Sequence, residues 1–175
     1  MSTNKKPREC TMGEMVEHYD YPGFTLYPFY HRSGKMPWAA AIELRLDKVD
    51  RIIWLSGHTG RDPETDREPR NWEEERKGVG RVVGGIKEQT LAAWTRIKEI
   101  LDGLGASLED IFQIYYYLVN RDDAWDMFEA TESFFAEHCP DLNENPRAGV
   151  LLKGIQLDLP DMLIEIEVAA ATGKK

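Results

Sequence analysis

Near its C-terminal end the chain reads Asn-Pro-Arg-Ala-Gly-Val-Leu-Leu-Lys-Gly at residues 145–154 and Met-Leu-Ile-Glu-Ile-Glu-Val-Ala-Ala at residues 162–170. Both stretches are mainly aliphatic, and the loop between them contains Pro160. They predict two short strands, over residues 147–152 and 162–169. These strands complete the predicted sheet and carry its charged side chains.

The last strand alternates apolar and acidic residues. Successive side chains of a strand point to opposite faces, so Glu165 and Glu167 leave one face while the residues between them fill the other. Arg147 opens the preceding strand. We therefore expect one permanent cation and two carboxylates on neighbouring strands. Which carboxylate faces a site stays open.

Three strands are predicted upstream. The aromatic stretch 24–30 is β-prone but contains Pro28, which favours an edge strand. Residues 39–46 and 51–55 predict a hairpin connected by residues 47–50.

Two helices and one more strand follow. Apolar residues recur at steps of three and four over residues 85–104, which predicts a helix that Gly105 ends. Residues 111–119 are apolar on both alternating faces, as in a central strand. A second helix is expected after Asp122 or Asp123.

This order predicts an α+β fold with both helices on one face of the sheet. The other face is too apolar to remain in water, so we expect it to pack against further copies of the chain in a closed ring. Residues 1–23 are expected to form an N-terminal arm and residues 24–175 one domain, with a long surface loop over residues 61–85.

Composition excludes several classes of function. The chain has 175 residues and a mass of 20.1 kDa, which fits one domain with its own core. A net charge of −9 argues against nucleic-acid partners. Without a secretion signal or a long apolar run, we expect a cytoplasmic protein with no membrane contact. Cys10 and Cys139 have neither disulfide nor zinc spacing, and no metal site is expected.

The chain resembles the Rid (reactive intermediate deaminase, YjgF-like) superfamily over about residues 38–170. Five motifs in the same order carry the resemblance. They are Leu-Ser-Gly-His-Thr-Gly-Arg-Asp-Pro-Glu-Thr at residues 55–65, Ile-Lys-Glu-Gln-Thr at 86–90, Leu-Gly-Ala-Ser-Leu-Glu-Asp-Ile at 104–111, Asn-Pro-Arg at 145–147 and Ile-Glu-Ile-Glu at 164–167.

The resemblance implies a chorismate-mutase-like α+β fold with a mixed sheet, assembled as a homotrimer around a barrel-like core, with sites between subunits. Better-known members of the superfamily hydrolyse unstable enamines and imines and release ammonia without a metal or organic cofactor. By resemblance, Arg147 grips the carboxylate of a small substrate and Glu165 holds the attacking water, with Glu167 one step along. Trp38 matches an aromatic residue of the pocket.

Two positions depart from the pattern. Phe128 stands where a polar residue is usual, and Gly149 stands where a cysteine is usual. These changes favour a larger, aromatic cleft, which suits relatives in aromatic degradation such as aminomuconate deaminases and hydroxylaminobenzoate lyases. Gly149 could also offer its backbone amide to a ligand. His58 lies beside a glycine at the end of a strand, where a site is expected.

Each of these residues also has a purely structural explanation. Arg147 could be a surface residue paired with Asp141 or Glu144. Glu165 could be an exposed residue of an edge strand, Trp38 a core residue, Gly149 a bulge, and His58 a hydrogen-bonded structural histidine.

The favoured function is a cofactor-independent hydrolase or lyase that releases ammonia from a carboxylate-bearing enamine or imine, with Arg147 as anchor and Glu165 as acid and base. The alternative is a non-catalytic, trimeric regulatory protein that binds small carboxylates. RNA cleavage, an activity ascribed to some relatives, is disfavoured by the acidic charge and by the lack of a histidine pair.

Overall fold

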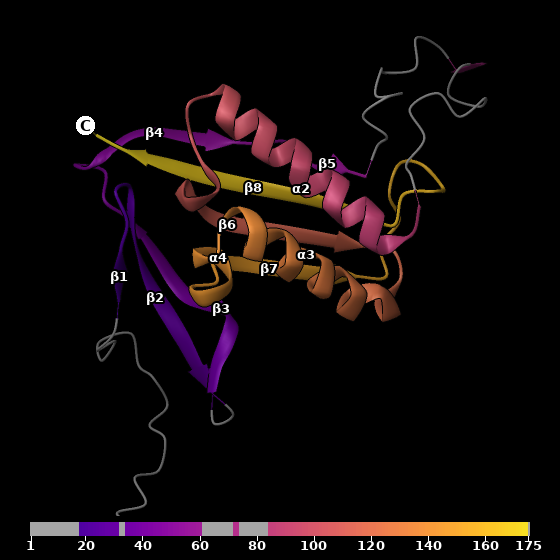
Figure 1. The fold of residues 1–175 in the computed structure, drawn as a ribbon, viewed down its shortest axis with the longest axis horizontal. Helices are drawn as coiled ribbons and strands as arrows, with labels where there is room; N and C mark the ends of the chain where they lie inside the picture. The colour runs from indigo at the N-terminus through magenta and orange to yellow at the C-terminus, as the bar shows by residue number, and fades with distance from the viewer. Residues whose placement is uncertain (1–17, 32–33, 61–71, 74–83, 175) are drawn as a thin grey trace, which may run out of the picture.

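The structure, a computed structural model, describes residues 18–31, 34–60, 72–73 and 84–174. The described part of the chain contains two sheets (Figure 1). The smaller sheet has the order β1-β2-β3, and the larger has the order β4-β8-β6-β7, with β5 paired to β8. The strands are β1 (Tyr19–Asp20), β2 (Phe24–His31), β3 (Gly34–Leu44), β4 (Val49–Trp54), β5 (His58–Thr59), β6 (Ile111–Leu118), β7 (Ala148–Lys153) and β8 (Ile164–Gly173).

The larger sheet is mixed, because β6 runs parallel to β7 and antiparallel to β8. Its interior position confirms that the stretch at 111–119 is a central strand. Ile114, Tyr116 and Leu118 alternate with Tyr115 and Tyr117 along β6, so each face of the sheet receives one set.

Both long helices, α2 (Ile86–Gly103) and α3 (Ala124–His138), lie across the same face of the larger sheet (Figure 1). The predicted α+β fold is therefore confirmed. Trp94 of α2 is fully buried, and its indole nitrogen donates a hydrogen bond of 3.1 Å to the hydroxyl of Thr131 in α3. Gly105 follows α2 with a φ of 69°, the left-handed conformation that ends a helix.

Three predictions about strand pairing are wrong. Residues 39–46 and 51–55 do not form a hairpin, because β3 pairs with β2 while β4 crosses to the larger sheet and pairs with β8. β2 is not an edge strand, since β1 pairs along its other side. β7 and β8 are not neighbours.

The physical reason is that other strands occupy both edges of β8. It pairs with β4 and β5 on one side and with β6 on the other, which leaves β7 only the far side of β6. Pro28 lies at a register shift between β2 and β3, where a strand tolerates a missing N–H donor.

The face of the larger sheet opposite the helices carries apolar side chains. By strand register it presents Trp54, Tyr115, Tyr117, Val150 and Leu152. Trp54 is 67% exposed and Leu152 is 45% exposed. None of the helices described here has the length and apolar composition needed to cross a membrane.

Only part of the predicted N-terminal arm and loop is described. Residues 19–20 of the arm form β1, and Tyr21 follows it, whereas residues 1–17 lie outside the described part. Of the loop at 61–85, residues 61–71 and 74–83 lie outside it as well.

Gln89 of α2 connects the helix to the loop before β8. It is 1% exposed, its amide nitrogen donates to the carbonyls of Asp161 and Gly84, and its amide oxygen accepts from the Leu163 N–H. Gln89→Leu should lower the free energy of unfolding by roughly 2–4 kcal/mol, because each unsatisfied buried polar group costs about 1–3 kcal/mol. Urea denaturation at fixed protein concentration measures this change.

The control is the same substitution at the exposed Gln156, which should stay within about 0.5 kcal/mol of the unaltered protein. Equal effects at the two positions would contradict the assigned role of Gln89.

Candidate functional site

A cavity of about 440 Å³ lies at the β7 edge of the larger sheet, on the side that the helices cover. It brings together four residues singled out from the sequence: Trp38, Phe128, Arg147 and Gly149. The other lining residues are Ile114, Tyr116, Thr131, Glu132, Phe135, Leu142, Asn143, Glu144, Pro146, Val150 and Leu151.

Helix and strand periodicity explain the aromatic walls. Phe128 and Phe135 are seven residues apart, or about two helical turns, so they share one side of α3. Tyr116 extends from β6 toward this side, and its ring meets that of Phe128 edge-on at 6.1 Å between centroids. Burial raises the pKa of Tyr116 well above its ordinary value, so the phenol stays neutral.

Gly149 lies opposite Ile114 in the parallel ladder of β6 and β7. A Cβ atom at this position would overlap the carbonyl oxygen of Ile114. The close approach of two backbones explains why glycine stands where the resemblance places a cysteine.

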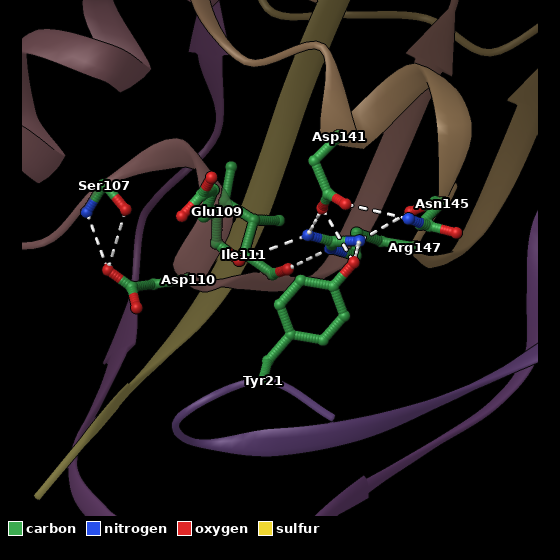
Figure 2. A network of polar contacts seen from close by, with 8 residues as sticks. All are labelled: Tyr21, Ser107, Glu109, Asp110, Ile111, Asp141, Asn145 and Arg147. Carbon is green, nitrogen blue, oxygen red and sulfur yellow. Dashed lines mark hydrogen bonds and ion pairs between the residues drawn. The ribbon is translucent and has the colours of Figure 1, made fainter. Parts of the chain in front are cut away.

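The guanidinium of Arg147 is buried and makes five hydrogen bonds (Figure 2). Backbone carbonyls of Ile111, Glu109 and Asn145 accept three of them. The Tyr21 hydroxyl accepts the fourth at 3.0 Å, and an Asp141 carboxylate oxygen accepts the fifth at 2.8 Å. Because a guanidinium has five N–H donors, none remains for another ligand in this arrangement.

Asp141 and Tyr21 also bind each other, so the three side chains form one network (Figure 2). Burial opposes the charge of Asp141, but hydrogen bonds from Asn145, Tyr21 and Arg147, together with the guanidinium charge, hold its pKa below the usual range. Burial raises the pKa of Tyr21 to about 12, against the lowering effect of Arg147. An ionised carboxylate, a neutral phenol and a cation therefore coexist at neutral pH.

The structural explanation offered for Arg147 is thus confirmed in part. It does pair with Asp141, but its side chain is 0% exposed and does not lie on the surface. The remaining exposure of the residue, 3%, therefore comes from its backbone. Its role as a substrate ligand stays a prediction.

A second group lies on the opposite face of the sheet. The Glu165 carboxylate packs so closely on Gly57 that a Cβ atom there would overlap it. Burial raises the pKa of Glu165, and the charges of Glu167 and Asp158 raise it further. Glu167 accepts a hydrogen bond of 3.0 Å from the Tyr117 hydroxyl.

His58 belongs to neither group. It lies opposite Ile166, whereas the next residue, Thr59, lies opposite Glu165. Alternation therefore places His58 on the face away from Glu165. No group of three or more potential ligand side chains in the described part of the chain could hold a metal ion.

Within one protomer the two groups are well separated. Ala148 lies opposite Gln113, and Glu165 lies opposite Tyr117, four residues further along β6. At about 3.3 Å per residue, Ala148, which follows Arg147, lies roughly 13 Å from Glu165 along the strand. Gly149, which lines the cavity, pairs with Ile114 on the face that the helices cover, whereas Glu165 pairs with Tyr117 on the other face. Tyr21 and Tyr116 were not predicted from the sequence as residues of a site. The alternation of β6 could have identified Tyr116, but no local pattern marks Tyr21.

Comparison with known proteins identifies relatives of this chain in sequence and in fold. Residues 33–172 match the family model described as Endoribonuclease L-PSP. A RutC family protein of Pyrococcus abyssi is 33% identical over 135 residues, which cover 77% of this chain and 85% of that protein. A RutC family protein of Pyrococcus horikoshii is 30% identical and covers 77% and 86%, respectively.

Solved structures of the same fold include the YjgF gene product from E. coli, with a TM-score of 0.54 and 24% identity over 75% of this chain and 91% of that one. The Rid family protein YyfB from Yersinia pestis has a TM-score of 0.56 and 23% identity, over 77% and 86%. E. coli TdcF, solved with bound serine, has a TM-score of 0.55 and 20% identity, over 75% and 90%. From the family match, the motifs and the fold together, the chain belongs to the Rid/YjgF family of Endoribonuclease L-PSP proteins.

Proposed function

We propose that this chain is a cofactor-independent deaminase that hydrolyses an enamine or imine and releases ammonia. The observation that carries the proposal is Glu165, a half-buried carboxylate with a raised pKa packed on the backbone of Gly57. It stands at the position where the resemblance places the glutamate that holds the attacking water. The aromatic cavity supports a substrate from aromatic or nitroaromatic degradation, as in aminomuconate deaminases or hydroxylaminobenzoate lyases.

The proposed chemistry needs one group that accepts and returns a proton. Glu165 takes a proton from water as the water oxygen bonds to the C=N carbon, and it passes that proton to the imine nitrogen to give a neutral carbinolamine. Glu165 then takes the proton of the carbinolamine hydroxyl as C=O forms and delivers it to the nitrogen as the C–N bond breaks, so that ammonia leaves. An enamine first takes a proton on carbon to become the imine. A raised pKa brings the carboxyl closer to the pH at which both directions of transfer are efficient.

Assembly supplies the missing proximity in this proposal. Glu165 and the cavity lie on different faces of one protomer, so a homotrimer would complete each site by placing the Glu165 face of one copy against the cavity of the next. Binding of a substrate carboxylate by Arg147 remains part of the proposal only if Asp141 and Tyr21 give up their hydrogen bonds.

A trimeric protein that binds a small carboxylate without turnover is the second candidate. The relative solved with bound serine favours it, because serine carries a carboxylate. RNA cleavage is less favoured, since the net charge is −9 and none of the described residues that line the cavity is histidine or lysine.

The catalytic test replaces the two carboxylates of β8 separately. Glu165→Gln should lower kcat for ammonia release by about 10²–10⁴-fold, because the amide cannot accept the proton from water. Glu167→Gln, the matched control, should keep most of the activity. It should also move the acidic limb of the pH–rate profile to lower pH, because the Glu167 charge raises the pKa of Glu165.

Ammonia release is measured with a panel of enamines, imines and hydroxylamino compounds. Equal rates for Glu165→Gln and the unaltered protein would refute the assignment. Binding of panel members with no turnover of any would favour the second candidate.

The assembly is tested at two leucines of similar exposure. Leu152 (45% exposed) lies on the face of the larger sheet opposite the helices, which we call the open face, and Leu91 (39% exposed) lies on α2. Leu152→Asp should dissociate the trimer, because it puts a charge into the proposed interface, whereas Leu91→Asp should not. Sedimentation equilibrium measures both. A monomeric unaltered protein would contradict the proposed assembly.

A further inference from the structure

We infer that Asp141 occupies, within the chain itself, the place on Arg147 that a substrate carboxylate would take. The cavity therefore selects a neutral or positively charged aromatic compound. This inference rests on the proposed function only in identifying the occupant of the cavity as the substrate. It departs from the carboxylate-bearing substrate predicted from the sequence, and from the substrates of aminomuconate deaminases and hydroxylaminobenzoate lyases, which also carry a carboxylate.

The outer edge of the Arg147 guanidinium is occupied by side chains of the same chain. Arg147 Nη2 donates to Asp141 Oδ2 at 2.8 Å, and Nη1 donates to the Tyr21 hydroxyl at 3.0 Å. The Tyr21 hydroxyl in turn donates to the same Asp141 oxygen at 2.7 Å. A carboxylate and a phenol together cover the two terminal nitrogens, which is the edge that binds a carboxylate in a two-pronged geometry.

Aromatic rings and hydrogen-bond acceptors keep the guanidinium of Arg147 from contact with a molecule in the cavity. The Tyr21 ring lies 4.3 Å from the guanidinium carbon and the Phe24 ring lies 5.4 Å from it. With these rings and the carbonyl acceptors around it, the side chain of Arg147 is 0% exposed. A molecule in the cavity therefore does not reach the guanidinium in this arrangement.

The lining of the cavity is acidic and aromatic. Apart from Arg147, the ionised side chains among its described lining residues are Glu132 and Glu144, both negative. Its walls include the aromatic side chains of Trp38, Tyr116 and Phe128. Ring faces and carboxylates attract cations and repel anions, so an anion gains nothing here that offsets its lost hydration. The volume, about 440 Å³, suits one small aromatic molecule.

The test uses three probes of nearly the same shape: benzoate, benzamide and benzamidinium. Isothermal titration calorimetry with the full chain should give affinities for benzamide and benzamidinium at least about tenfold higher than for benzoate. Tighter binding of benzoate than of benzamide, or no measurable binding of any probe, would overturn the inference.

Two variants locate the effect. Asp141→Asn should raise the affinity for benzoate by about tenfold and leave benzamide within about twofold, because the cation then lacks its internal counter-charge. Glu132→Gln should weaken benzamidinium selectively, whereas Glu137→Gln, an exposed control on the same helix, should not. Unchanged benzoate affinity in a folded Asp141→Asn variant would show that Asp141 does not exclude anions.

Thermal denaturation establishes whether Asp141→Asn folds. If it does not, the comparison of the three probes on the unaltered protein still decides the inference. The ammonia-release assay is independent of these titrations. If turnover requires Glu165 but benzoate binds more tightly than benzamide, the inference is refuted and the proposed function stands. If benzamidinium is preferred but no substrate is turned over, the inference stands and the proposed function is refuted.

Discussion

The buried guanidinium of Arg147 is the interaction on which this end of the molecule depends. It joins the segment after β1, the start of β6, the short helix α4 (Asp141–Glu144) and the start of β7 through five hydrogen bonds. A buried cation is tolerated only when it is paired and fully hydrogen-bonded, and here every donor has an acceptor. One side chain thus holds together three regions that are distant in sequence, around residues 21, 109–111 and 141–147.

That arrangement also shapes the cavity beside it. The chain approaches β6 so closely at Gly149 that no side chain fits there, and the space above is left to the aromatic residues of β6 and α3. The guanidinium of Arg147 is buried beside the cavity, whereas Glu132 and Glu144, which line the cavity, are acidic. The resemblance implies a contact between Arg147 and the carboxylate of a substrate. In this chain the carboxylate that contacts Arg147 is that of Asp141.

Glu165 and the cavity lie on opposite faces of one sheet in this fold. Glu165 packs on Gly57 on the open face, while the cavity lies under α3 and α4 on the other. Two sites on opposite faces cannot act on one molecule within a protomer. The proposed assembly follows from this geometry and from the apolar side chains, such as Leu152, that the open face presents.

Local patterns in the sequence were sufficient to determine the α+β class, both long helices, the central strand at 111–119 and the position of nearly every strand, because periodicity and turn residues act over short distances. They also identified Trp38, Phe128, Arg147 and Gly149, which the structure gathers around one cavity. Only the tertiary structure decided which strands pair and which groups surround Arg147. Pairing of β8 along both edges separates Arg147 from Glu165, and the approach of Tyr21 buries the Arg147–Asp141 pair, which the sequence placed at the surface as one of two possible pairs. Strand pairing and the contact of Tyr21 with Arg147 join segments far apart in the chain, 126 residues in the second case, and no local pattern records such contacts.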